Sequence, residues 1–201
     1  MKGNKTAIIA FVLLLITSSV YRVIPGLPAG LAPQLAMAIF GGAVFSDRKI
    51  ALLVPLLSLF LSDLLFHVLF LGGMAPVPGF YDGQVSNYIL FMLLTLFGSL
   101  MKKKNLIQIT FYTTVGSLLY FLASNFLVWF SGAGYARPKT FDGLMLCYGD
   151  GLAFYRDYGW IHGFSFNFII GDLAWSFLLF GVFVLLTRPA ASTRTQVARE
   201  Y

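Results

Sequence analysis

The sequence predicts an all-α membrane protein, a bundle of six transmembrane helices with one further short helix in an outer loop. Composition is the first reason: 58% of the 201 residues are hydrophobic and 11% are charged, whereas a soluble domain carries about 25% charged residues. Mean hydropathy is +0.81. The second reason is the arrangement of six apolar stretches between short polar breaks. The third is that Lys and Arg gather in alternate breaks, a pattern typical of polytopic membrane proteins.

The apolar stretches predict the spans in chain order. We expect the first to be a retained helix and not a cleaved signal peptide, because bulky Tyr21 and Arg22 follow it where a cleavage site needs small residues. The second and fourth are shorter than the ~20 residues that cross a bilayer, so local thinning or burial in protein has to accommodate them. We expect spans at residues 6–23, 31–46, 50–71, 86–101, 106–130 and 161–187.

The basic residues predict the direction of the spans. Ten of the fourteen fall on one side and four on the other. Positive residues favour the cytoplasm, so we expect both termini inside a bacterial cytoplasmic (inner) membrane, with residues 1–190 as one membrane domain and 191–201 as a cytoplasmic tail. The net charge of +6 then reflects topology and contact with the lipid bilayer, not a nucleic-acid partner. The ten are Lys2, Lys5, Arg48, Lys49, Lys102, Lys103, Lys104, Arg188, Arg194 and Arg199; the four are Arg22, Arg137, Lys139 and Arg156.

The outer breaks are rich in Gly, Pro and aromatic residues. Residues 141–158 are too polar and too short to span, so they predict a short helix on or in the outer membrane surface. Seven of the ten tyrosines lie at or beyond the outer ends of the spans. An interfacial aromatic belt accounts for such residues, but a belt has two faces and the inner ends hold almost no Tyr or Trp. A ligand surface is the second interpretation, and both stay open.

Polar residues within the spans gather toward the outer side. Asp63 lies about 20 Å along its span, and His67 is one turn further on the same face. Asp172 falls at or above the midplane of the last span, and Asn125 and Trp129 occupy the outer third of the fifth. Ionisable groups in a bilayer are costly and usually functional. Because the inner halves contain none, the pattern predicts a polar pocket that is open to the outside above an apolar plug.

Each of these residues also has a structural interpretation. Asp63 can bond His67 or Ser62 and lock the bundle, and Asp172 can form an ion pair with Arg22 or Arg156. Asn125 can join two helices by a hydrogen bond. These alternatives stay open at the level of sequence.

Several strings resemble an uncharacterised bacterial family of membrane transport proteins, itself similar to the S components of ECF-type vitamin transporters. The resemblance implies a six-helix, S-component-like fold that binds a vitamin in an outward cavity and topples in the membrane to deliver it. It carries over Asp63, Asn125, Trp129, Cys147, Tyr148, Arg156 and Asp172 as binding positions. The strings are APQLAMAIFGGAVFSDRK (32–49), LVPLLSLFLSDLLF (53–66), ASNFLVWFSG (123–132), FDGLMLCYGDGLAFYRD (141–157) and IIGDLAWSFLLFG (169–181).

The first predicted span departs from that pattern. Typical S components carry Ala-xxx-Ala motifs there for docking on the shared transmembrane subunit, but this chain has Ala7 and Ala10 only. Its small-residue rows sit in the second span, beginning at Ala32 and Ala38. Such rows let another helix approach closely, either a partner subunit or a neighbouring span. The partner is therefore an ECF-type energising module, or the protein acts alone as the cobalamin S components do.

We expect a transport protein, not an enzyme, that binds a small vitamin-like nutrient and needs no cofactor of its own. Aromatic faces would stack a ring, an arginine would meet an anionic group, and the acids and amides would orient polar edges. Cobalamin is one candidate substrate, because a Cys147 thiolate can ligate cobalt; no other metal site is expected. The candidate binding residues are Arg22, Asp63, His67, Asn125, Trp129, Cys147, Tyr148, Arg156, Trp160 and Asp172.

Two other function classes remain. An intramembrane enzyme would use Asp63 and Asp172 as paired carboxylates, although neither carries the flanking motif of the intramembrane aspartyl proteases. A structural assembly subunit would use the same residues to hold helices together. Motifs of serine hydrolases, zinc peptidases and P-loop ATPases do not occur in the sequence.

Overall fold

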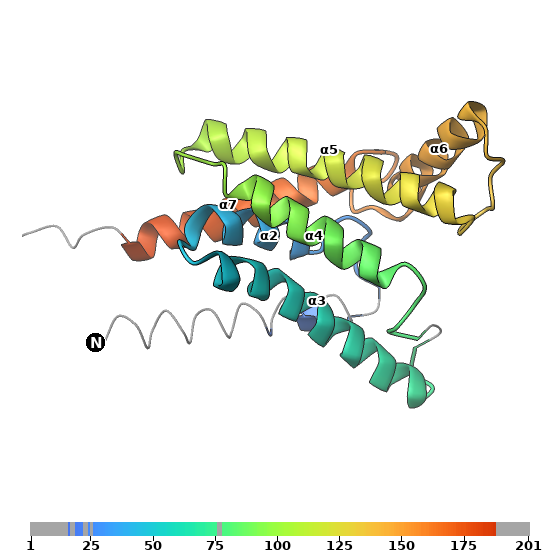
Figure 1. Ribbon diagram of the computed structural model, residues 1–201, viewed down its shortest axis with the longest axis horizontal. Helices are drawn as coiled ribbons and strands as arrows, with labels where there is room; N and C mark the ends of the chain where they lie inside the picture. Colours follow the sequence, from blue (N-terminus) through green and yellow to red (C-terminus); the bar gives the residue numbers. More distant parts are fainter. Residues whose placement is uncertain (1–15, 17–18, 22–23, 25, 76–77, 188–201) are drawn as a thin grey trace, which may run out of the picture.

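The computed structural model describes residues 16, 19–21, 24, 26–75 and 78–187, and this part of the chain is all-helical. Its helices are α2 (Gln34–Val44), α3 (Arg48–Leu71), α4 (Gln84–Gly98), α5 (Leu106–Ser131), α6 (Phe141–Tyr158) and α7 (Asn167–Thr187). Five of them, α2 to α5 and α7, run along the long axis in alternating directions, and α6 lies at one end beside the last turns of α5 (Figure 1). Within the described residues there is no strand, so the predicted all-α class is confirmed.

Three helices, α3, α5 and α7, are long and apolar enough to cross a membrane. The apolar helices α2 and α4 have only 11 and 15 residues, so helix length does not confirm a count of six spans. Most of the predicted first span and the whole of the tail 191–201 lie outside the described residues. Residues 19–21 are described, and they are helical.

Polar caps explain where several helices begin. Asp47 accepts a hydrogen bond from the Lys49 amide at the start of α3, and Thr140 accepts one from the Gly143 amide at the start of α6. Such caps satisfy amides that have no partner within the helix. The helix predicted at 141–158 is present with those bounds.

The last helix begins six residues later than predicted, at Asn167 instead of residue 161. The side chain of Asn167 explains the difference. Its Nδ2 donates to the carbonyls of Tyr155, Ile161 and Phe164, and its Oδ1 accepts from the Ile161 amide. A fully buried amide thus holds a turn over the residues just before α7.

Helix α2 is the centre of the bundle and contacts α3, α4, α5 and α7. Ala36, Ala38 and Ile39 are fully buried. A methyl group on Gly42 would overlap the carbonyl of Thr95 in α4, and one on Gly41 would lie 3.1 Å from the carbonyl of Ala51 in α3. The small residues of this segment therefore let neighbouring helices of the same chain approach. Burial in protein also explains how so short an apolar helix is accommodated.

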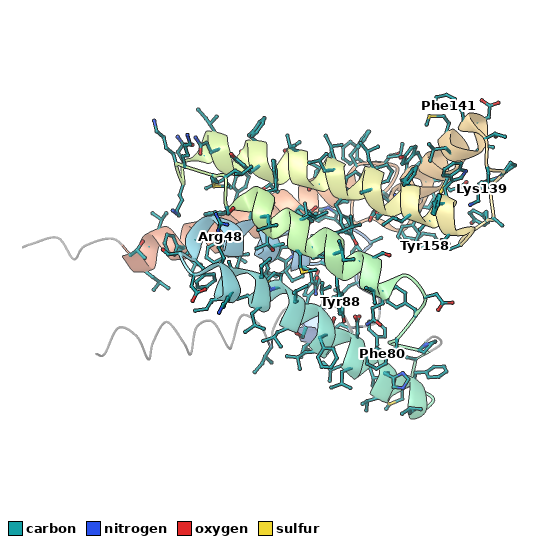
Figure 2. All side chains as sticks on the ribbon, viewed as in Figure 1. Arg48, Phe80, Tyr88, Lys139, Phe141 and Tyr158 are labelled. Carbon is teal, nitrogen blue, oxygen red and sulfur yellow. The ribbon has the colours of Figure 1, made fainter. Side chains whose placement is uncertain are left out.

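The two ends of the bundle differ in charge. Arg48 lies at one end, and Lys139, Phe141 and Tyr158 lie at the other (Figure 2). The break between α4 and α5, at the same end as Arg48, holds Lys102, Lys103 and Lys104. Between the ends, the outward faces of the helices expose many large apolar side chains. Soluble proteins rarely expose large contiguous apolar patches. Exposed examples are Leu53, Val68, Phe111, Leu178 and Leu185.

Candidate functional site

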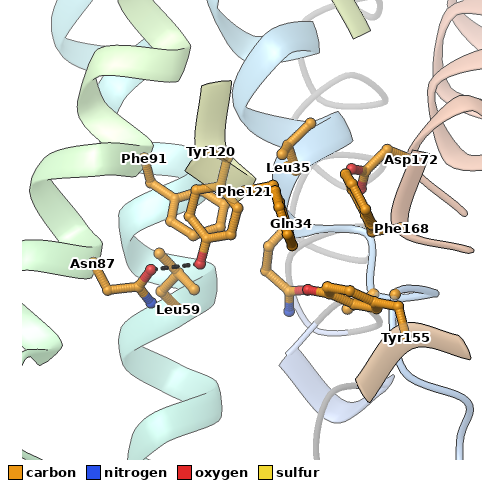
Figure 3. Close-up of a pocket in the computed structure, with 12 residues that line it drawn as sticks. Gln34, Leu35, Leu59, Asn87, Phe91, Tyr120, Phe121, Tyr155, Phe168 and Asp172 are labelled. Atoms are coloured by element: carbon orange, nitrogen blue, oxygen red, sulfur yellow. Dashed lines mark hydrogen bonds between the residues drawn. The ribbon is translucent and has the colours of Figure 1, made fainter. Parts of the chain in front are cut away.

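A cavity of about 180 Å³ lies inside the bundle, and every described helix contributes to its wall (Figure 3). It sits at the N-terminal ends of α2, α4 and α7, against the second half of α5 and the last turn of α6. These ends are opposite the cluster of lysines between α4 and α5. The lining residues are Gly30, Ala32, Gln34, Leu35, Leu59, Asn87, Phe91, Tyr120, Phe121, Tyr155, Phe168 and Asp172.

Aromatic rings form much of this wall. Phe121 and Phe168 stack with ring centroids 5.0 Å apart and planes 11° apart. Tyr155 packs against Phe168 at 4.9 Å, and Phe91 packs against Tyr120 at 5.1 Å. Such mutual packing fixes each ring, so the cavity has a defined shape.

Asp172 brings a carboxylate to the cavity from the second turn of α7, and it is 6% exposed. Ser117 on α5 donates to its Oδ2 at 2.6 Å. One helical turn away, Thr113, which precedes Ser117 in α5, donates to Ser176, which follows Asp172 in α7, at 2.9 Å. The i, i+4 spacing on each helix aligns the two hydrogen bonds. A short polar seam therefore joins α5 to α7 and ends at Asp172.

A glycine contact places the chain before α2 beside this carboxylate. Gly30 has φ +80°, and a Cβ on it would lie 2.8 Å from the backbone of Phe168. A methyl group on Gly171 would overlap the Gly30 carbonyl. The Ala29 amide donates to the Tyr158 carbonyl at 2.7 Å, which ties the same segment to α6. Only glycine permits this approach, because other residues bear a Cβ and disfavour positive φ.

Tyr155 brings a hydroxyl to the cavity from α6. Burial raises the pKa of this phenol to about 12, and the negative charge of Asp172 acts in the same direction. Within the described part of the chain the hydroxyl makes no hydrogen bond, although the Tyr155 carbonyl accepts one from Asn167. The protonated phenol is therefore available to a guest in the cavity.

Asn87 and Tyr120 form the polar part of the opposite wall. The Tyr120 hydroxyl donates to Asn87 Oδ1 at 2.6 Å, as the dashed line in Figure 3 marks. Asn87 Nδ2 donates in turn to the Tyr81 hydroxyl at 3.2 Å. This chain of bonds links α4, α5 and the loop before α4.

Asp63 is buried next to this wall but does not line the cavity. It accepts hydrogen bonds from Gln84 Nε2 at 2.6 Å and from the Tyr88 hydroxyl at 2.7 Å, both on α4. A methyl group on Gly79 would overlap the Asp63 carbonyl, so the loop before α4 packs tightly on α3 here. His67, one turn further along, packs on Phe80 with ring centroids 5.0 Å apart, also away from the cavity. Asp63 thus joins α3 to α4.

Four predicted residues hold α6, or the loop just before it, against the end of α5, outside the cavity. Cys147 is buried, and its thiol donates to the carbonyl of Asn125 at 3.5 Å. Burial raises the pKa of this thiol. Tyr148 donates to the Leu122 carbonyl, and the Trp129 indole donates to the Pro138 carbonyl. These contacts give the predicted residues Asn125, Trp129, Cys147 and Tyr148 a positioning role.

The remaining predicted residues also lie elsewhere. Arg156 forms an exposed ion pair with its neighbour Asp157 at 2.7 Å, and Trp160 is 48% exposed. Arg22 falls outside the described residues. Of the ten predicted positions, Asp172 is therefore the one that the described structure places in the cavity wall.

Sequence reasoning did not select Asn87, Tyr120, Tyr155 or Phe168. Asn87 and Tyr120 carried a usable signal, since both are polar groups in the outer part of apolar spans. Tyr155 belonged to the excess of outer tyrosines, but nothing distinguished it from the others. Among the described side chains, no group of three potential metal ligands comes together.

The fold and this site define the class: a protein that is all-helical in its described part, with three helices of membrane-spanning length and a small cavity with polar and aromatic walls. The chain belongs to a family of unknown function, DUF6580, whose sequence model matches residues 2–195. Comparison with curated proteins gave no match. Comparison with solved structures gave none either.

Proposed function

We propose that this chain is a multi-pass, S-component-like protein of the bacterial cytoplasmic membrane that captures a small vitamin-like nutrient from outside the cell. Both termini lie in the cytoplasm in this proposal. Alternating helix directions and the lysines between α4 and α5 support that orientation. The cavity then lies toward the outer leaflet, where a nutrient arrives.

The observation that carries the proposal is the cavity itself. Helices α2 to α7 all contribute to its wall, and it combines five aromatic rings with one buried carboxylate. Ligand sites typically have apolar, aromatic walls with a few directional polar groups. A purely structural core would fill this space with side chains, because protein interiors are close-packed.

Cavity size favours a small nutrient over cobalamin. An engineered cavity of about 150 Å³ binds one benzene molecule, and this cavity measures about 180 Å³. A corrin macrocycle is many times larger. Cys147, the candidate cobalt ligand, is bonded to Asn125 at the α5–α6 contact, outside the cavity. The proposed substrate is accordingly a single-ring compound.

The proposal contains no catalytic step. Asp63 and Asp172 are bonded to different helices, α4 and α5 respectively, so the geometry offers no support for paired-carboxylate catalysis. Delivery to the cytoplasm would follow from a change in how the protein sits against a partner or the bilayer. The small residues of α2 are already in contact with α3 and α4, so an energising module, if one is used, would dock elsewhere.

The experiment pairs mass spectrometry of co-purified small molecules with thermal melting of the detergent-solubilised protein. Ala32→Leu fills the cavity wall, and Ala133→Leu, in the exposed loop after α5, is the matched control. We expect the wild type and the control to retain a bound compound that raises Tm, and Ala32→Leu to lose it. Retention of the compound by Ala32→Leu would show that the cavity is not the binding site.

A further inference from the structure

We infer that the cavity selects a small flat cation, whose N–H groups bond Asp172 and the Tyr155 hydroxyl while its ring lies against the aromatic wall. The inference rests on the proposed function and specifies the charge of the substrate. It differs from the sequence-based expectation of an anionic group held by Arg156 or Arg22, of which Arg22 lies outside the described residues.

Charge is the first argument. Among the described residues, the lining contains one acidic side chain, Asp172, and no Lys, Arg or His. Ion pairs within the described residues join Arg137 to Asp150 and Arg156 to Asp157, and leave Asp172 without a cationic partner. A buried carboxylate is costly unless a cation accompanies it. A cationic guest would supply that partner, whereas an anionic guest would add a like charge.

Hydrogen-bonding capacity is the second argument. An ionised carboxylate accepts about four hydrogen bonds, and Ser117 supplies the one that the described structure assigns to Asp172. Tyr155 is half-buried in the cavity wall, and its hydroxyl makes no hydrogen bond within the described chain. Figure 3 shows both side chains on the same side of the cavity, across from Asn87. The open hydrogen-bonding capacity of Asp172 and Tyr155 therefore lies on one wall and favours a guest that donates hydrogen bonds from one edge.

The opposite wall is already engaged. Asn87 accepts from Tyr120 and donates to Tyr81. This wall fixes the shape of the cavity and leaves the recognition of charge to Asp172. Selectivity should therefore be lost when that single carboxylate is neutralised.

Aromatic rings are the third argument. Five of them line the cavity: Phe91, Tyr120, Phe121, Tyr155 and Phe168. The face of an aromatic ring attracts a cation, most strongly where water is excluded. An aromatic wall with one carboxylate is thus suited to a planar, positively charged group.

The test uses three probes of nearly equal size and shape that differ in charge: benzamidinium, benzamide and benzoate. Binding to the purified full-length protein in detergent is measured by calorimetry and by Tm. We expect benzamidinium to bind about tenfold more tightly than benzamide or better, and benzoate to produce no shift. Asp172→Asn should bring benzamidinium down to the benzamide level, and Tyr155→Phe should weaken it several-fold. Asp157→Asn, which removes an exposed carboxylate on α6, should leave it unchanged.

The wild-type preference decides the inference even where Asp172→Asn does not fold, and Tyr155→Phe supplies a second variant. Equal or tighter binding of benzamide or benzoate, or binding of none of the three, would overturn it. The proposed function fails separately, when Ala32→Leu still holds the co-purified compound. A cavity that prefers benzoate would thus remain a capture site for a ring, with the opposite charge selectivity.

Discussion

Ser117 on α5 donates a 2.6 Å hydrogen bond to the carboxylate of Asp172 on α7. This contact joins two helices of membrane-spanning length at the edge of the cavity. It gives the buried acid a fixed orientation and leaves the rest of its hydrogen-bonding capacity to a guest. The residue that we propose for recognition is therefore held by a contact that can be removed on its own.

Ser117→Ala should destabilise the protein by about 1–3 kcal/mol, because it leaves a buried carboxylate without its donor. Thermal melting in detergent measures the effect. Ser124→Ala, which removes only a local bond to the Phe121 carbonyl, is the control and should have a much smaller effect. If Asp172→Asn and Ser117→Ala are combined, the losses should not add, because the two residues form one contact. Additive losses would contradict the described pairing.

Asp63→Ala should lower stability without abolishing ligand binding. The change removes the acceptor of Gln84 and Tyr88, and each buried donor left unbonded costs about 1–3 kcal/mol. Asp63 does not line the cavity, so ligand affinity measured on the folded fraction should stay within about tenfold of wild type. Complete loss of binding by a monodisperse Asp63→Ala protein would show that Asp63 belongs to the binding site.

Gly42→Ala and Gly149→Ala should have opposite effects. The new methyl group at Gly42 would overlap the Thr95 carbonyl, whereas at Gly149 it meets nothing within 4 Å. Overpacking costs about 1–3 kcal/mol, while replacing Gly by Ala within an exposed helix gains about 0.5–1 kcal/mol. Melting temperatures of the two variants test the close contact between α2 and α4. Equal Tm values would show that the helices separate easily there.

Acid should remove the contribution of the Arg137–Asp150 ion pair to the stability of the fold. This pair ties the loop after α5 to α6. The guanidinium bonds the Asp150 carboxylate at 2.8 Å and holds its pKa below the usual value. A lowered folded-state pKa stabilises the fold above the unfolded pKa of about 3.9 and loses this effect as pH falls through the folded value. Wild type should therefore exceed Asp150→Asn in Tm by a constant amount near neutral pH, and the gap should close below about pH 4. Arg137→Gln should behave in the same way, and parallel curves down to about pH 3 would contradict the pairing.

Membrane orientation can be tested with single cysteines in a Cys147→Ser background. Lys103→Cys, between α4 and α5, should react with a membrane-impermeant maleimide only after the cells are opened. Ala133→Cys, after α5, should react in intact cells, because the proposal puts that loop outside. The reverse pattern would overturn the proposed direction of transport. In the wild type, Cys147 should react slowly, since it is buried and its thiol pKa is raised.

Local sequence was enough to predict most helices. The expected spans at 50–71 and 106–130 correspond to α3 and α5 within two residues at each end, and the helix at 141–158 has the predicted bounds. Apolar runs, breaks and capping residues act over a few neighbours, so they can be read along the chain. The start of α7 could not be predicted from local sequence, because Asn167 ends the preceding turn through contacts that reach back to α6.

The sequence by itself determined which segments are helical and apolar and at which ends of them the charges fall. Tertiary structure decided which polar groups meet: Asp172 faces the cavity with Tyr155 and, across it, Asn87, while Asp63 and Cys147 are used between helices. The physical reason is that rotation and spacing of helices depend on close contacts such as Gly42 on Thr95 and Gly171 on Gly30. These contacts join residues far apart in the chain, and no local pattern encodes them.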